Sequence, residues 1–158
     1  MSTTPAKRAE LPQLDLDRQL CFPLYAAGRS VTRRYAALLA DVGLTYPQYL
    51  CLLALWGSEG PMSVGELGER LRLDSGTLTP VLKRLEAAGH VVRRRDPADE
   101  RRVLLDVTAA GWTLRDQVAD VPERLIAGMG LPVTKARQLR SLLDELLESL
   151  DESDGAQD

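Results

Sequence analysis

The feature that most restricts the fold of this sequence is a pair of helical patterns joined by a very short connection. Ser63 and Glu66 have the spacing of a capping box, in which each side chain binds a backbone amide at the helix start. Arg72–Leu73 forms the connection, and Asp74 is the expected N-cap of a second helix that Gly89 ends. Two helices joined by so tight a turn predict a helix-turn-helix.

The apolar period changes directly after this pair. Residues 91–95 and 102–107 have the short, β-branched pattern of strands, and residues 96–100 between them have the composition of a hairpin turn. The sequence therefore predicts a wing over about residues 90–107. The fold class expected is mainly α with a small β-hairpin wing, a winged helix-turn-helix.

Further helices are predicted on both sides of this unit. Apolar residues recur at helical spacing from Leu24 to Val42, and Pro23 is expected near the start of that helix, or at a kink if the helix begins as early as Asp15 or Asp17. A helix is predicted from Thr108 to Met129, and after a break the last helix carries a leucine seam. Such a seam requires a partner helix, so a two-fold dimer through the N- and C-terminal helices is expected. The seam consists of Leu139, Leu143, Leu146 and Leu150.

Length and charge agree with one domain. With 158 residues and 44% apolar residues the chain can bury a core, and we expect a flexible leader at 1–13, the domain at 14–150 and an acidic tail at 151–158.

The net charge is -3, but residues 70–102 hold nine basic against five acidic residues, and no basic residue follows Arg140. Charge acts over roughly 8 to 10 Å, so the basic middle can still face an anionic partner. Without a membrane span or a secretory leader, a cytoplasmic protein is expected.

Polar side chains on the second helix and the hairpin are typical of a surface that binds double-stranded DNA. Short hydroxyl side chains let a helix approach base edges, and arginines on a hairpin can enter the minor groove. The alternative is an ordinary solvated surface. Pro80 is unfavourable for the predicted helix, because it removes the backbone donor to the Gly76 carbonyl. The candidates are Ser75, Thr79 and Lys83 on the helix and Arg93, Arg94, Arg95, Arg101 and Arg102 on the wing.

The sequence resembles the MarR family of winged-helix regulators over nearly the whole span from Leu14 to Leu150. The wing carries the family pattern as Asp99, Arg101, Leu105, Val107, Thr108 and Gly111. Within the family, LCFPLYAAGR at 20–29, LTYPQYL at 44–50 and LDSGTLTPVLKRLEAAG at 73–89 are most similar to organic hydroperoxide sensors of the OhrR type. The resemblance implies a repressor that acts as a reduced dimer on a pseudo-palindromic operator, and it adds Thr77 and Asp99 to the DNA-binding candidates.

The resemblance also identifies Cys21 as the residue that a peroxide oxidises. The partial positive charge of a helix N-terminus favours the thiolate that such chemistry needs, and Tyr25 lies on the same helix face. Tyr35 lies about 21 Å further along that helix, so it can reach only the Cys21 of an antiparallel partner helix. The resemblance implies that arrangement, with Tyr46 completing the pocket. The alternative for Cys21 is a small hydrophobic residue in a dimer core.

The other candidate groups are expected to be structural. Cys51, within an apolar helix, is predicted to pack in the core, and His90 to be a solvated loop residue. Some proteins of the OhrR type have a second, resolving cysteine in the helices after the wing, whereas this chain has no cysteine after Cys51. Oxidised Cys21 is therefore expected to be captured by a small cellular thiol or by a backbone nitrogen, with Cys51 as the alternative resolving thiol. No cofactor, metal site or catalytic residue is predicted. Two alternatives remain open: a repressor released by a small phenolic ligand, and a thiol peroxidase.

Overall fold

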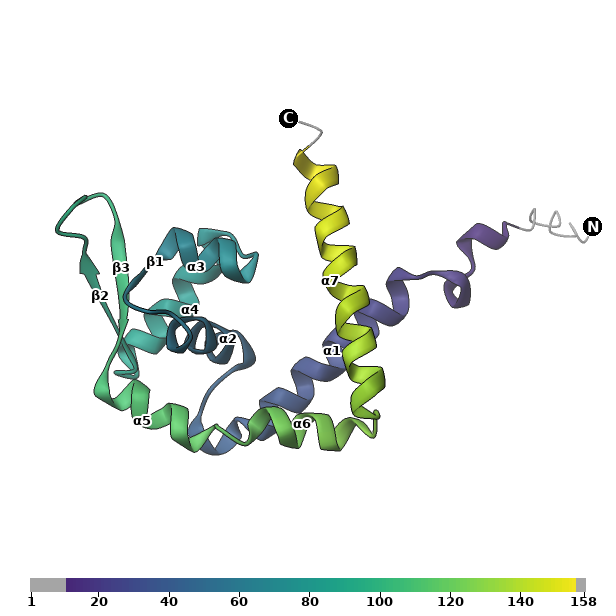
Figure 1. The fold of residues 1–158 in the computed structure, drawn as a ribbon, viewed down its shortest axis with the longest axis horizontal. Helices are drawn as coiled ribbons and strands as arrows, with labels where there is room; N and C mark the ends of the chain where they lie inside the picture. The colour runs from purple at the N-terminus through teal and green to yellow at the C-terminus, as the bar shows by residue number, and fades with distance from the viewer. Residues whose placement is uncertain (1–10, 156–158) are drawn as a thin grey trace, which may run out of the picture.

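The chain folds into a group of helices packed beside a small sheet, with a longer helical arm on the other side (Figure 1). The computed structural model describes residues 11–155. In Figure 1 the sheet and helices α2 to α4 form one end of the molecule, and α1, α6 and α7 extend away from it. The helices are α1 (Cys21–Leu38), α2 (Tyr46–Trp56), α3 (Val64–Leu71), α4 (Ser75–Ala87), α5 (Ala109–Gln117), α6 (Val121–Met129) and α7 (Val133–Gly155), and the strands are β1 (Met62–Ser63), β2 (Val91–Arg95) and β3 (Val103–Val107).

The predicted helix-turn-helix is formed by α3 and α4. The backbone N–H of Ser63 donates to Glu66 Oε2 at 2.7 Å, and that of Glu66 donates to Ser63 Oγ at 3.2 Å, which completes the capping box. Arg72 ends α3 in the left-handed region at φ 55°, and Asp74 caps α4 by accepting from the backbone N–H of Thr77 at 2.8 Å. These interactions join residues within one turn of each other, which is why the sequence pattern predicted them.

The wing is confirmed, and a strand that the sequence did not predict completes its sheet. β2 and β3 pair antiparallel, and β1 pairs with the other edge of β3 through Met62 and Leu105. The third strand lies directly before the capping box, so it ties the start of α3 to the wing. Arg102 belongs to the turn and not to β3, because its backbone N–H donates to the Asp99 carbonyl at 2.9 Å.

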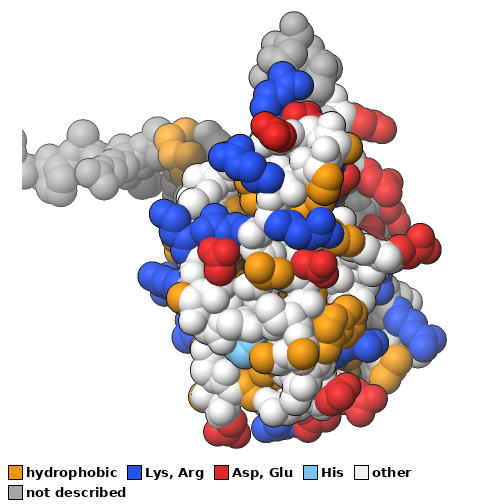
Figure 2. Space-filling view, turned by 90° about the vertical axis from the view of Figure 1, so that its left-hand side faces the viewer, with side chains coloured by type: hydrophobic (Ala, Val, Ile, Leu, Met, Phe, Trp, Pro, Cys, Tyr) orange, Lys and Arg blue, Asp and Glu red, His pale blue; other side chains and the backbone are white. Residues whose placement is uncertain are grey.

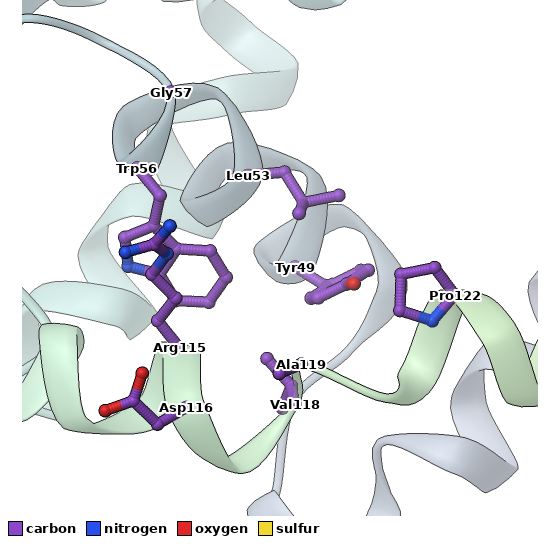
Figure 3. Close-up of a pocket in the computed structure, with 9 residues that line it drawn as sticks. All are labelled: Tyr49, Leu53, Trp56, Gly57, Arg115, Asp116, Val118, Ala119 and Pro122. Carbon is purple, nitrogen blue, oxygen red and sulfur yellow. The ribbon is translucent and has the colours of Figure 1, made fainter.

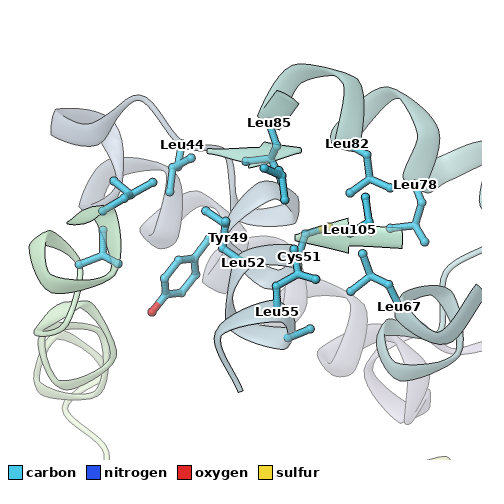
Figure 4. Packing of buried hydrophobic residues seen from close by; sticks show 14 of the residues in the cluster. Leu44, Tyr49, Cys51, Leu52, Leu55, Leu67, Leu78, Leu82, Leu85 and Leu105 are labelled. Atoms are coloured by element: carbon cyan, nitrogen blue, oxygen red, sulfur yellow. The ribbon is translucent and has the colours of Figure 1, made fainter. Parts of the chain in front are cut away.

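A leucine-rich core lies between α2, the helix-turn-helix and the sheet (Figure 4). Leu52 from α2, Leu67 from α3, Leu82 and Leu85 from α4 and Leu105 from β3 are each at most 1% exposed. Burying a leucine stabilises a fold by roughly 1.5–3 kcal/mol. The core thus fixes the orientation of α4 relative to the wing.

The prediction of one continuous helix from Thr108 to Met129 was wrong. The structure ends α5 at Gln117 and begins α6 at Val121. Val118 and Val121, on either side of the break, are both 2% exposed, so the turn in the chain buries both side chains. Pro122 contributes to the break, because proline lacks the amide that a continuing helix needs but is tolerated in the first turn of a new one.

The first helix begins at Cys21, so Pro23 lies in its first turn and needs no kink. Among the described residues, none of the α1 side chains is buried, and Leu24 is 43% exposed. The end of α1 packs against α6 and the core, while Phe22, Leu24 and Tyr25 near its start remain exposed. The second copy of the chain that is expected to cover this side of α1 stays a prediction.

The last helix also has an uncovered apolar side. Leu139 and Leu150 are 51% and 53% exposed, while Leu143 and Leu146 are half-buried. α7 continues through the expected start of the acidic tail to Gly155. Most of the expected leader, residues 1–10, and the end of the tail, residues 156–158, lie outside the described residues. Two short 3-10 turns, at 12–14 and 16–18, precede α1.

Within residues 11–155, no helix is both long and apolar enough to cross a membrane. The same residues contain no group of three or more His, Cys, Asp or Glu side chains arranged to bind a metal ion.

Candidate functional site

The outer face of α4 holds the helix candidates for DNA contact, but two of the hydroxyl groups already have partners. Thr77 Oγ1 donates to Asp74 Oδ2 at 2.9 Å, and Thr79 Oγ1 donates to the Ser75 carbonyl at 2.6 Å. These bonds stabilise the first turn and orient the threonine methyl groups. Ser75 and Lys83 are exposed, whereas Thr79 is half-buried.

The cap of α4 is a negative charge held in place by the helix itself. Hydrogen bonds from the backbone and the side chain of Thr77 hold the pKa of the Asp74 carboxyl below its usual value. Asp74 therefore stays ionised under ordinary conditions and keeps the helix start rigid. Helix α4 continues past Pro80 to Ala87, so the proline expected to cost one hydrogen bond does not end it.

The wing arginines differ in what they contact. Figure 2 looks at the end of the molecule that carries the wing and shows Lys and Arg side chains interspersed with Asp and Glu side chains. Arg93 pairs with Glu86 of α4 at 2.7 Å, and Arg102 pairs with Glu66 of α3 at 3.2 Å. Two of the five guanidinium groups are thus bound by carboxylates of the helix-turn-helix.

The other three wing arginines contact only groups within the hairpin itself. The side chain of Arg101 is 91% exposed, and Asp99 Oδ1 accepts from its backbone N–H at 3.1 Å and from its Nε at 3.2 Å. Arg95 donates to the Glu100 carbonyl at 2.8 Å, and Arg94 lies 3.9 Å from Asp106. Arg101 is therefore the wing cation that projects furthest into solvent, with Asp99 setting its direction.

Cys21 is the first residue of α1, and it is exposed. This is the position at which unpaired backbone amides give a helix its partial positive charge. Tyr25 lies one turn further on and is 62% exposed. Its hydroxyl accepts from Arg29 Nη1 at 3.2 Å, and the Arg29 guanidinium lies 5.6 Å from the centre of its ring. A cation therefore lies over the tyrosine that follows the thiol by one helical turn.

Tyr35 and Tyr46 meet at the opposite end of α1. Their rings stack with centroids 4.1 Å apart, and the Tyr49 ring lies 5.6 Å from Tyr35. Burial raises the pKa of Tyr35 to about 12 and, in the same direction, the pKa values of Tyr46 and Tyr49, so all three phenols stay protonated and can donate. The structure brings Tyr35 to Tyr46 but leaves both at the far end of the helix from Cys21 of the same chain.

Cys51 lies in the core between α2 and the sheet. Its side chain is fully buried, and burial raises the pKa of its thiol to about 11. A thiol of that kind is neutral and unreactive near neutral pH. The packing role expected for Cys51 fits this environment.

A hollow that the sequence did not reveal lies between α2 and the α5–α6 connection (Figure 3). Its volume is about 500 Å³. Tyr49, Leu53 and Trp56 face it from α2, opposite Arg115 and Pro122. The spacing of the three α2 residues on one helix face was a signal for it, but the opposite wall depends on the unpredicted break before α6.

These features define a winged helix-turn-helix protein: a capped recognition helix α4, a basic hairpin beside it and a helical arm that carries an exposed thiol. Comparison with known proteins identifies its family. A model of the MarR family matches residues 44–103. The HTH-type transcriptional regulator TtmR of Methylorubrum extorquens is 50% identical over 137 residues, covering 87% of this chain and 68% of TtmR.

The organic hydroperoxide resistance transcriptional regulator of Bacillus subtilis is 44% identical over 137 residues, which cover 87% of this chain and 92% of that protein. A solved structure of reduced AbfR bound to DNA, a protein of Staphylococcus epidermidis, has a TM-score of 0.75 at 36% identity, covering 89% of this chain and 96% of AbfR. The chain belongs to the MarR family of DNA-binding transcriptional regulators. Membership of this family confirms the expected fold class. It also confirms the prediction that the chain is a transcriptional regulator and not an enzyme.

Proposed function

We propose that this regulator represses transcription as a two-fold dimer and releases its operator when an organic hydroperoxide oxidises Cys21. The observation that carries the proposal is the position of Cys21, exposed at the first residue of α1. The similarity to the organic hydroperoxide regulator of Bacillus subtilis supports the choice of oxidant.

In the proposed complex, α4 enters the major groove and the wing lies over the adjacent minor groove. Ser75, Thr77 and Lys83 would face base edges or phosphates, and Arg101 would enter the minor groove, where the negative potential is concentrated. Arg94 and Arg95 would add phosphate contacts. In a dimer, two such units would read half-sites about 34 to 36 Å apart or a multiple of that distance.

The dimer is proposed to form through the exposed apolar sides of α1 and α7. Leu24, Leu139 and Leu150 are each more than 40% exposed in one chain, and burial of such a surface favours association. If the two copies of α1 run antiparallel, the stacked Tyr35 and Tyr46 of one copy would approach Cys21 of the other. Protonated phenols there can donate hydrogen bonds to a thiolate.

The proposed chemistry is a two-electron oxidation of sulfur. The thiolate of Cys21 attacks one peroxide oxygen, an S–O bond forms as the O–O bond breaks, and the alkoxide leaves and takes a proton to become an alcohol. A small thiol then attacks the sulfenic acid, forming a mixed disulfide and water. The buried, protonated Cys51 is unsuited to this second step.

A second candidate is release by a small phenolic ligand. The hollow of about 500 Å³ favours it, because aromatic walls and a guanidinium suit an aromatic acid. One experiment separates the two candidates: operator binding by the wild type and Cys21→Ser, with an organic hydroperoxide, hydrogen peroxide or a phenolic acid added.

The proposed mechanism predicts release of the wild type, but not of Cys21→Ser, by the organic hydroperoxide, with a mass gain of one oxygen or one thiol adduct at Cys21. Release of both proteins by peroxide would contradict it. Release by the phenolic acid alone would support the second candidate, and sustained peroxide consumption over many turnovers would point to a peroxidase.

A further inference from the structure

The wing is attached to both helices of the helix-turn-helix by arginine–carboxylate pairs. Arg93 reaches Glu86 on α4, and Arg102 reaches Glu66 on α3. In both pairs the partners come from different elements of the fold. Arg93 lies in the middle of β2, whereas Arg102 lies at the end of the hairpin nearest its turn, directly before β3.

Arg102 makes the more extensive set of contacts. Its Nη2 lies 3.2 Å from Glu66 Oε1, and its Nη1 lies 3.6 Å from Asp96 Oδ2, on a side chain that is only 13% exposed. Its backbone closes the hairpin as well, because its carbonyl accepts from the Asp96 N–H at 2.9 Å. Together the guanidinium and its two carboxylate partners carry one net negative charge, so the group does not attract a third anion.

Glu66 links this pair to the start of α3. One of its oxygens, Oε2, accepts from the Ser63 N–H at 2.7 Å in the capping box, while Oε1 faces Arg102. Ser63 itself belongs to β1 and pairs with Leu104 of β3. Movement of the hairpin at Arg102 would therefore disturb the helix cap and the sheet together.

Arg93 makes the corresponding connection to α4. Its Nε donates to Glu86 Oε2 at 2.8 Å, and its Nη2 lies 2.7 Å from the same oxygen. Both atoms are directed at one carboxylate oxygen, so this guanidinium is also occupied. By contrast, Arg101 at the tip is 91% exposed and contacts Asp99 within its own turn.

We propose that Arg102 and Arg93 are positioning residues that fasten the wing to α3 and α4 and so determine where Arg101 meets the duplex, without contacting DNA themselves. The proposal rests on the DNA-binding role of the wing proposed above. It differs from the sequence-based expectation, in which all five wing arginines contact DNA. A wing held in place before binding loses less conformational freedom on binding.

The test is operator binding over a series of salt concentrations for the wild type, Arg101→Gln, Arg102→Gln and Glu66→Gln. Binding is plotted as log K against the logarithm of the salt concentration, and each phosphate contact that is lost reduces the magnitude of that slope by about 0.9. Loss of Arg101 is expected to lower the slope by about that amount, whereas Arg102→Gln is expected to weaken binding roughly three- to tenfold with an unchanged slope.

Glu66→Gln supplies the isosteric partner variant, since glutamine also completes a capping box but carries no charge for Arg102. It is expected to weaken binding about as much as Arg102→Gln, and the double variant no more than either single one. Arg140→Gln, which breaks an exposed pair with Asp144 on α7, is the matched control and should bind as the wild type does.

A slope lowered by about one in Arg102→Gln, or tighter binding by Glu66→Gln, would overturn the proposal, because either result means that Arg102 contacts DNA when free. Amide exchange of Asp96 and Arg102 without DNA gives an independent readout, expected to accelerate in both single variants and not in the control. If exchange accelerates but the wild type binds no duplex from its own promoter, the positioning role of Arg102 is retained and the proposed DNA-binding role of the wing fails. If exchange is unchanged in both variants, Arg102 does not fasten the wing to α3 and the proposal is wrong.

Discussion

The ring of Tyr35 lies nearly flat on the ring of Tyr46, with 12° between the ring planes. Tyr35 comes from the end of the helix that begins with Cys21, and Tyr46 is the first residue of α2, the helix that forms much of the core. The stack therefore connects the arm that carries the thiol to the unit that carries the recognition helix. A displacement of either tyrosine would therefore shift the packing between α1 and α2.

Tyr35→Phe keeps the stacked ring but removes its hydroxyl. The pKa of Tyr35 is raised to about 12, above 10.0 for an ordinary tyrosine, so Tyr35 stabilises the fold below pH 10 and this contribution is lost as the pH rises through about 12. We expect Tyr35→Phe to lose stability less steeply than the wild type above pH 10, and to lack the highest component of the ultraviolet phenol titration. Oxidant-driven release should slow while operator affinity is retained. An unchanged titration would contradict the burial that the structure assigns to this ring.

Gly111→Ala is expected to be strongly destabilising. A Cβ at Gly111 would clash with the His90 carbonyl, which accepts from Thr108, and would lie 2.7 Å from Val107 Cγ1. Overpacking of this kind costs typically 1–3 kcal/mol. Gly65→Ala is the control, since its Cβ would meet only Ser63 Oγ at 3.9 Å and alanine favours the helix by roughly 0.5–1 kcal/mol. Urea unfolding of the two variants should give shifts of opposite sign.

Acid should weaken the helix caps in a specific pH range. The hydrogen bonds of Thr77 hold the pKa of Asp74 below its usual 3.8, so the contribution of Asp74 to stability is present above that value and is lost as the pH falls through the lower folded-state pKa. Asp74→Asn retains a capping side chain that does not titrate. We expect the stability of the wild type to fall more steeply than that of Asp74→Asn below about pH 4 in urea unfolding. Parallel curves would exclude Asp74 as the titrating cap.

Arg72 in the helix-turn-helix turn pairs with Asp151 near the end of α7. The two side chains are 47% and 58% exposed, and such a surface pair contributes at most about 1 kcal/mol. Asp151→Asn should therefore leave the thermal unfolding midpoint nearly unchanged but accelerate amide exchange in the α3–α4 turn. Asp144→Asn makes the same charge change on α7 away from that turn and should not have this effect. Equal exchange in the two variants would mean that the pair does not restrain the turn.

Much of the fold could be predicted because its signals are local. The capping box of Ser63 and Glu66 and the cap of α4 by Asp74 each act over three residues, and the helices and hairpin follow from apolar spacing. The break before α6 was missed because the apolar pattern continues through it. Strand β1 was missed because two residues carry no period of their own.

Capping signals and apolar spacing were enough to predict α3, α4, the hairpin and the basic side chains that the hairpin carries. Other features depend on the tertiary fold: the stack of Tyr35 on Tyr46, and the binding of Arg93 and Arg102 by carboxylates while Arg101 stays exposed. The pair of Glu66 and Arg102 could not be predicted because the two residues are 36 positions apart in the chain. Their contact exists only because the core fixes the wing against α3, and no local pattern encodes that placement.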